Sequence, residues 1–146
     1  MKLFTKLLAI TSIFTATSVL AGPPVTVTFK NLGTATAVYK MTTNNEISTY
    51  SFASPKPAAN VPAGSINTYT VTSTLSTDIN YAYVRYSIGA KTCEFKTTFL
   101  NKLVSVGNKI PQWTKTATPS GGAVCAATIT TANPTTYEWA VEFTMK

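Results

Sequence analysis

The chain has 146 residues, of which 12 are basic, five are acidic and none is histidine, so its formal net charge is +7. Without histidine, neither a Ser-His-Asp nor a Cys-His catalytic group is available, and a typical zinc site lacks ligands. The sequence also has no glycine-rich phosphate loop and no Asp-x-Asp-x-Asp-Gly calcium loop, so we expect a non-enzymatic protein without metal or cofactor.

Residues 1–21 have the pattern of a secretory signal peptide. A cationic start is followed by the apolar run 7–20, and small residues end at Ala21. The alternative, a membrane anchor, is disfavoured because the run is short for a span and no stop-transfer charge follows it. Cleavage after Ala21 leaves a single domain, 22–146, with a charge of +5 because two lysines leave with the leader. We predict a secreted protein of the bacterial periplasm or the extracellular space.

The remaining segment is predicted to be all-β. Its many threonine, valine and tyrosine residues suit a pleated sheet, and no window shows a capped helical stripe of apolar residues. Short alternating segments recur between turn signals, and the prolines of 54–64 mark a loop. The predicted strands, in chain order, are 25–30, 35–41, 47–52, 66–73, 80–88, 92–99, 113–118, 123–131 and 137–145. Residues 103–106 are at best a further short strand.

About eight or nine short strands in one domain predict a two-sheet β-sandwich, Ig-like or jelly-roll-like, in preference to a closed barrel. The connections are short, which favours antiparallel pairing throughout, because parallel pairs need long crossovers. The order of the strands does not follow from the sequence.

The two cysteines are predicted to form one disulfide. Cys93 shares the inward side of its strand with Phe95 and Phe99, and Cys125 shares a side with Ile129. Two inward cysteines in a secreted chain are typical of a structural bridge. The alternative, a catalytic thiol, has no histidine to act as its base.

The candidate ligand-binding residues are Tyr81, Tyr83 and Arg85, which lie on the outward side of strand 80–88. Two aromatic rings beside an arginine suit stacking on a sugar or contact with a lipid interface. Trp113, at the end of a loop, is predicted to assist them. The alternative is that the tyrosines are packed beneath the proline loop or a neighbouring strand. We predict a glycan or lipid of a cell envelope or host surface as the ligand, and a glycan, lipid or protein at a cell surface as the partner.

Three other possibilities stay open at this point. A pair of the carboxylates could flank a glycosidic bond as acid and base, although several lie on solvated strand faces. The scattered lysines are most often a sign of solubility; they also favour loose contact with an anionic envelope surface, and they do not indicate nucleic acid. In place of ligand binding by a monomer, the protein could be a structural subunit that assembles by strand addition through 25–30 or 137–145.

Overall fold

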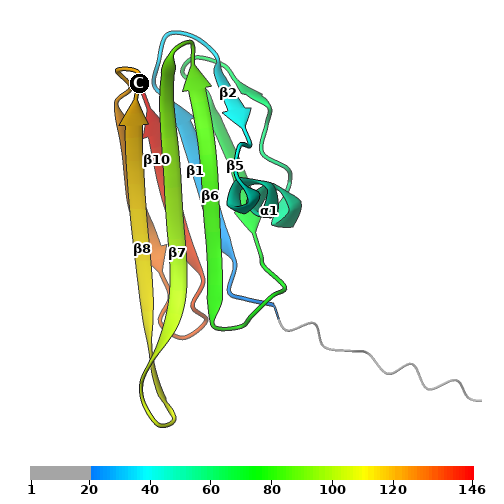
Figure 1. The fold of residues 1–146 in the computed structure, drawn as a ribbon, viewed down its shortest axis with the longest axis vertical. Helices are drawn as coiled ribbons and strands as arrows, with labels where there is room; N and C mark the ends of the chain where they lie inside the picture. The colour runs from blue at the N-terminus through cyan, green and yellow to red at the C-terminus, as the bar shows by residue number, and fades with distance from the viewer. Residues whose placement is uncertain (1–20) are drawn as a thin grey trace, which may run out of the picture.

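In the computed structural model, residues 21–146 form two five-stranded β-sheets that lie face to face (Figure 1). The strands are β1 (Val25–Asn31), β2 (Ala37–Lys40), β3 (Ala53–Ser54), β4 (Asn60–Val61), β5 (Ile66–Val71), β6 (Ile79–Ile88), β7 (Lys91–Ser105), β8 (Asn108–Ser120), β9 (Cys125–Ala132) and β10 (Trp139–Met145). The β1 sheet has the order β3-β5-β1-β10-β9, and the β6 sheet has the order β4-β2-β6-β7-β8. The predicted signal peptide, 1–21, lies almost wholly outside the described residues.

Strict alternation in the strands supplies the core between the two sheets. Burial alternates along the whole of β1 and along the whole of β10, as period-two strands with one dry face require. Aromatic rings from the two sheets stack across the interior: Phe29 on Tyr86 with ring centroids 3.5 Å apart, and Phe95 on Phe143 at 4.7 Å. The predicted inward sides of these strands are therefore confirmed, and the fold is sandwich-like.

The predicted disulfide is also confirmed. Cys93 in β7 is bonded to Cys125 in β9, with the two Cα atoms 5.8 Å apart. Because β7 belongs to the β6 sheet and β9 to the β1 sheet, the bond joins the two layers covalently.

One pair of strands contradicts the expectation of antiparallel pairing throughout. β1 and β10 run parallel, with Val25 opposite Trp139 and Asn31 opposite Met145. Short connections impose antiparallel pairing only on strands that are neighbours in sequence. β1 and β10 come from opposite ends of the described chain, so no short connection dictates their relative direction.

The predicted strand 47–52 is wrong, because these residues belong to the helix α1 (Asn44–Phe52). Thr43 and Glu46 form a capping box, in which each side chain accepts a hydrogen bond from the other residue's backbone N–H. At the opposite end, Lys56 Nζ donates to the carbonyls of Tyr50 and Ser51 at 2.8 and 2.7 Å. The segment 44–52 has no strong apolar stripe, and its helix is stabilised by these hydrogen bonds at its two ends. Within 21–146, no helix is long and apolar enough to cross a membrane.

The hairpin of β7 and β8 is longer than predicted. Alternation weakens after Phe99, yet β7 continues to Ser105 and β8 begins again at Asn108. The end of this hairpin extends beyond both sheets (Figure 1), so neither of its faces is buried and alternation is not required there. β8 lies at the edge of its sheet, where its prolines, Pro111 and Pro119, are tolerated.

Removal of the disulfide through Cys93→Ser/Cys125→Ser is expected to lower the free energy of unfolding by about 3–4 kcal/mol. The reason is that the bond closes a long loop, with a sequence separation of 32, and so restricts the unfolded chain. Urea denaturation of the variant and the parent protein measures the difference. Two reactive thiols in the denatured parent protein without reductant would contradict the assignment.

Candidate functional site

The candidate site is a concave surface between α1 and the outer face of the β6 sheet, which we name the helix cleft. Its volume is about 250 Å³. The residues that line it come from α1 and its cap, and from β6, β7 and β8: Thr43, Asn45, Glu46, Tyr83, Arg85, Glu94, Phe95, Lys96, Thr116 and Thr118. Two of the predicted ligand-binding residues, Tyr83 and Arg85, are among them.

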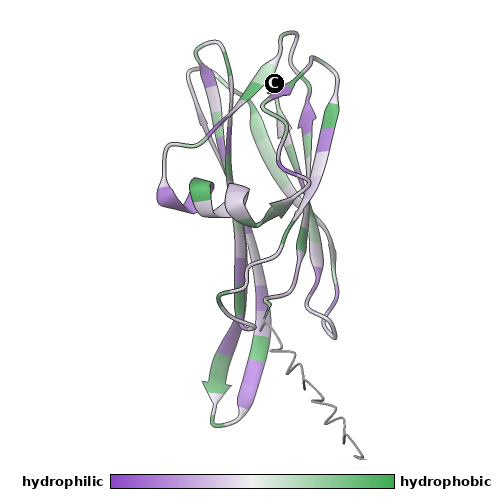
Figure 2. Ribbon diagram, turned by 90° about the vertical axis from the view of Figure 1, so that its right-hand side faces the viewer, coloured by the Kyte–Doolittle hydropathy of each residue, from purple (hydrophilic) through white to green (hydrophobic). Residues whose placement is uncertain are grey.

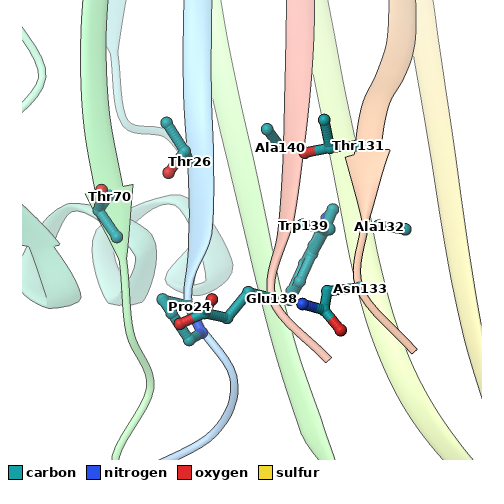
Figure 3. A pocket seen from close by; sticks show the side chains of 9 residues that line it. All are labelled: Pro24, Thr26, Thr70, Thr131, Ala132, Asn133, Glu138, Trp139 and Ala140. Atoms are coloured by element: carbon teal, nitrogen blue, oxygen red, sulfur yellow. The ribbon is translucent and has the colours of Figure 1, made fainter. Parts of the chain in front are cut away.

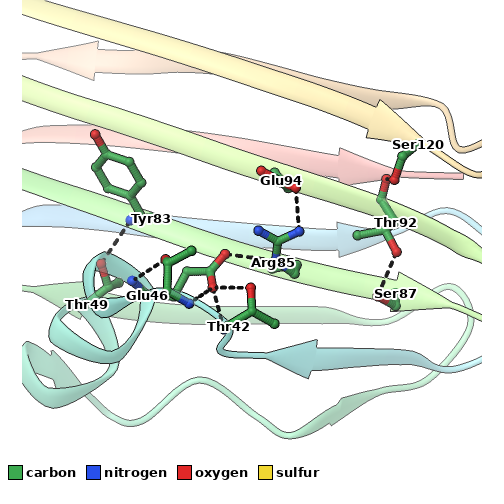
Figure 4. Close-up of polar contacts among 10 residues, drawn as sticks. Thr42, Glu46, Thr49, Tyr83, Arg85, Ser87, Thr92, Glu94 and Ser120 are labelled. Carbon is green, nitrogen blue, oxygen red and sulfur yellow. Dashed lines mark hydrogen bonds and ion pairs between the residues drawn. The ribbon is translucent and has the colours of Figure 1, made fainter.

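The position of α1 follows from the shortness of β2. β2 pairs with β6 only from Arg85 to Ser87, which leaves the earlier part of the β6 edge without a strand. α1 occupies this edge: the backbone N–H of Tyr83 donates to Thr49 Oγ1 at 2.9 Å (Figure 4), and Tyr81 Oη donates to Ser48 Oγ at 3.2 Å. A helix that covers an unpaired strand edge satisfies its backbone groups and blocks edge-to-edge association.

Arg85 lies between two carboxylates at the floor of the cleft (Figure 4). Its Nε donates to Glu46 Oε1 at 2.9 Å, and its Nη1 donates to Glu94 Oε1. Glu46 is buried and its other oxygen accepts three hydrogen bonds, from the backbone N–H groups of Thr42 and Thr43 and from the Thr42 hydroxyl, at 2.6 to 3.0 Å. The same carboxylate therefore caps α1 and fixes the guanidinium.

The hydrogen bonds determine the protonation of Glu46. Burial by itself would raise the pKa of this carboxyl, but the backbone N–H groups of Thr42 and Thr43, the Thr42 hydroxyl and the charge of Arg85 together lower it. A general acid for glycoside cleavage needs a raised pKa. The chemistry of Glu46 therefore gives no support to the glycosidase alternative, although Glu46 and Glu94 both lie in the cleft.

The aromatic part of the cleft is the ring of Tyr83. Lys96 Nζ lies over this ring, 5.0 Å from its centroid, and the Tyr81 ring meets it edge to face at 5.2 Å. The two tyrosines are half-buried against α1, and the proline loop is not the element that holds them. Tyr81 thus supports Tyr83 from the side, while Tyr83 and Arg85 face the cleft.

Trp113 is not brought to this surface. It lies opposite Phe99 in the β7–β8 pairing, on the inward side of the sheet, with ring centroids 5.7 Å apart. Its Nε1 donates to the Tyr137 carbonyl at 3.3 Å. Since Thr98 and Thr114 point outward beside Tyr81, the alternation of β8 directs Trp113 to the opposite face.

A second concave surface, on the outer face of the β1 sheet, was not predicted from the sequence. It has a volume of about 440 Å³ and is lined by Pro24, Thr26, Thr70, Thr131, Ala132, Asn133, Glu138, Trp139 and Ala140 (Figure 3). Trp139 is buried, so no aromatic ring face is exposed there. Thr26 and Thr70 lie opposite each other in the paired strands β1 and β5. The alternation within each strand indicates from the sequence that both residues point outward, but the sequence does not indicate that these two strands pair.

The chain matches no protein-family model, and no curated protein matches it. The assignment of a function therefore depends on the geometry of the surfaces described above.

Glu46→Gln is expected to lower the free energy of unfolding by about 2–3 kcal/mol, because it removes the charge that both the helix cap and the half-buried guanidinium of Arg85 require. Glu142→Gln is the matched control. Glu142 pairs with Lys30 at 2.6 Å on a partly exposed surface, so its loss is expected to cost less than about 1 kcal/mol. Urea denaturation at neutral pH measures both. Equal losses in the two variants would contradict the role of Glu46.

The lowered pKa of Glu46 also predicts a loss of stability in acid. Because folding lowers this pKa from its ordinary value of 4.5, the carboxylate contributes stability above pH 4.5, and that contribution disappears as the pH falls through the folded value. Glu46→Gln is expected to flatten this part of the dependence of stability on pH. Denaturation curves measured from pH 6 down to about pH 2 test this expected loss of stability. A parent protein whose free energy of unfolding rises as the pH falls would contradict it.

Proposed function

We propose that the protein is a secreted, non-catalytic binding protein whose helix cleft binds a neutral glycan of a cell envelope or host surface. The observation that carries the proposal is the convergence of the Tyr83 ring and the Glu46–Arg85–Glu94 network in one concave surface. An aromatic ring offers a face to the C–H side of a sugar, and charged groups held in fixed positions offer hydrogen bonds to its hydroxyl groups.

The charges of the cleft favour a neutral ligand. Glu46 and Glu94 balance Arg85 and Lys96, so the cleft presents donors and acceptors without a net charge. Asn45, Thr116 and Thr118 add further polar groups at its rim. A lipid chain would leave this many polar groups without partners, which is costly, and a sugar would satisfy them.

Lys96 determines access to the ring. Its ammonium group lies over Tyr83, and a sugar that stacks there displaces it. An exposed cation–π contact of this kind is worth only about 0.5–1 kcal/mol, and the flexible lysine stem lets the group move aside. The ring is thus available to a ligand at a small cost.

Secretion and the type of sandwich are parts of the same proposal. The Cys93–Cys125 bond is compatible with an oxidising compartment such as the periplasm or the extracellular space. Two packed sheets of five strands support an Ig-like or jelly-roll-like sandwich.

Tyr83→Ala is expected to weaken glycan binding by about tenfold or more, since it removes the stacking surface, worth about 1–2 kcal/mol. Binding of segment 22–146 is measured on a glycan array and then by calorimetry with the glycan that the array selects. The double variant Tyr81→Ala/Tyr83→Ala gives the loss for the pair, and liposomes without glycan show whether lipid alone is bound.

Thr70→Ala is the matched control for that experiment, because it alters the second concave surface and leaves the helix cleft intact. Binding that survives Tyr83→Ala but is lost in Thr70→Ala would move the site to the β1 sheet. Binding that is unchanged in both variants would overturn the proposal.

A second candidate function, assembly by strand addition, is favoured by the edge of the β1 sheet. β9 lies at this edge, and its sequence from Cys125 to Ala132 contains no proline and no charged residue. Lys115 Nζ donates to the Ala127 carbonyl at 2.6 Å and so occupies one backbone group of this strand. The segments predicted as donors are β1 and β10, and both have partners on either side within the sheet. The other edge strand of this sheet, β3, has only two residues, so β9 with eight residues is the accepting edge in this second candidate function.

Thr130→Pro tests this second candidate. Thr130 has no partner in β10, because the pairing shifts register between Ile129 and Thr131, and proline is tolerated at such a bulge. Light scattering of the parent protein at rising concentration is expected to show polymers that the variant does not form. A parent protein that stays monomeric at all concentrations would exclude self-assembly through this edge.

A further inference from the structure

The tip of the β7–β8 hairpin carries apolar side chains that the rest of the protein does not cover. β6 begins at Ile79, opposite Leu100, so beyond that point β7 has no neighbour in its sheet except β8. Figures 1 and 2 show the hairpin projecting past both sheets, with hydrophobic residues at its end. The exposed apolar residues of the tip are Leu100, Leu103, Val104, Val106 and Ile110.

Exposure on both faces distinguishes the tip from an ordinary sheet surface. Leu103 is 61% exposed, and Val106, in the turn between β7 and β8, is fully exposed. Ile110 is opposite Lys102 and Leu103 is opposite Lys109, so apolar residues alternate with lysines on both sides of the ribbon. A flat partner would cover one side of the ribbon only, whereas a fluid interface surrounds a projecting tip on all sides.

From Phe95 to Ser120 every charged residue of the β7–β8 hairpin is a lysine. Between Glu94 and Glu138 the sequence has no acidic residue, and two of its lysines, Lys102 and Lys109, lie at the tip. Lys109 is held by Asp78, which also accepts a hydrogen bond from Asn101 at 3.1 Å, and these contacts brace the base of the tip against the loop before β6. Lys102 has no ion-pair partner among the described residues.

We propose that the tip of the β7–β8 hairpin docks at the interface of a bilayer that contains anionic phospholipid. Valine and leucine side chains enter the boundary between headgroups and acyl chains, and the lysines stay at the level of the phosphate groups, as amphipathic side chains do at interfaces. The site uses none of the residues of the helix cleft, so it does not rest on glycan binding.

The backbone limits how deep the tip enters. Asn101 N–H donates to the Asp78 carbonyl at 2.8 Å, and beyond Asn101 the outer edge of β7 has no neighbouring strand. N–H and C=O groups without partners are not tolerated in hydrocarbon. The tip therefore rests in the hydrated interface and does not span the bilayer. Leu75 and Ile79 are also exposed; Ile79 lies opposite Leu100 and extends the apolar surface from the tip toward the sheet.

Co-sedimentation with vesicles tests this proposal. Segment 22–146 is used, because all ten strands and the core between the described sheets lie within it. We expect binding to vesicles of phosphatidylcholine with phosphatidylglycerol and weaker binding to phosphatidylcholine alone. Val106→Asp is expected to reduce binding by about tenfold or more, and Lys102→Gln by about fivefold.

Val124→Asp is the matched control. Val124 is 66% exposed beside the turn that leads into β9, so the same substitution there changes charge and hydropathy without touching the tip. Circular dichroism and urea denaturation establish that both variants fold. Blue-shifted tryptophan emission of Val106→Trp on vesicles, absent in Val124→Trp, is the second expected signal.

Three outcomes would overturn the proposal. One is that the parent protein binds neither kind of vesicle, and another is that Val106→Asp and Val124→Asp bind equally well. The third is a dimer in light scattering without lipid that Val106→Asp abolishes, since the tip would then be covered by a second copy of the chain. If Tyr83→Ala loses glycan binding but binds vesicles as well as the parent protein does, the helix cleft and the hairpin tip act independently of each other.

Discussion

The dry layer of rings between the two sheets is the constraint on which the remaining structure depends. Phe29 stacks on Tyr86 and Phe95 stacks on Phe143, so each ring pair has one member in each sheet. These contacts set the register of β6, β7 and β10, because a shift of one residue would move every ring to the solvent side. The outward direction of Arg85 and its neighbours is a consequence of the same register.

Glu46 connects the architecture to the candidate site. The carboxylate completes the capping box of α1 and at the same time pairs with Arg85 on β6, so the helix and the sheet are joined at the floor of the helix cleft. The short β2 leaves room for α1 at the edge of β6. The cleft thus exists because a helix occupies a place where a longer strand would have closed the surface.

The two proposed sites have opposite characters. The helix cleft is concave and balanced in charge, and its polar groups are held by hydrogen bonds, which suits a ligand with many hydroxyl groups. The hairpin tip is convex, apolar and cationic, which suits an extended surface. A protein that rests on an anionic surface by its tip would hold the cleft, part of the same rigid sheet, at a defined place above that surface.

The sequence by itself determined the features that depend on local alternation: most of the strands, the inward rings, the Cys93–Cys125 pair and the shared outward side of Tyr83 and Arg85. It also contained the capping box of α1, Thr43 and Glu46, which the alternation of apolar residues does not reveal. Only the tertiary structure decided the parallel pairing of β1 with β10, the inward direction of Trp113 and the joining of Glu46 to Arg85. The physical reason is that side-chain alternation is set by each residue's own backbone, whereas strand neighbours and ion pairs depend on which distant segments pack together.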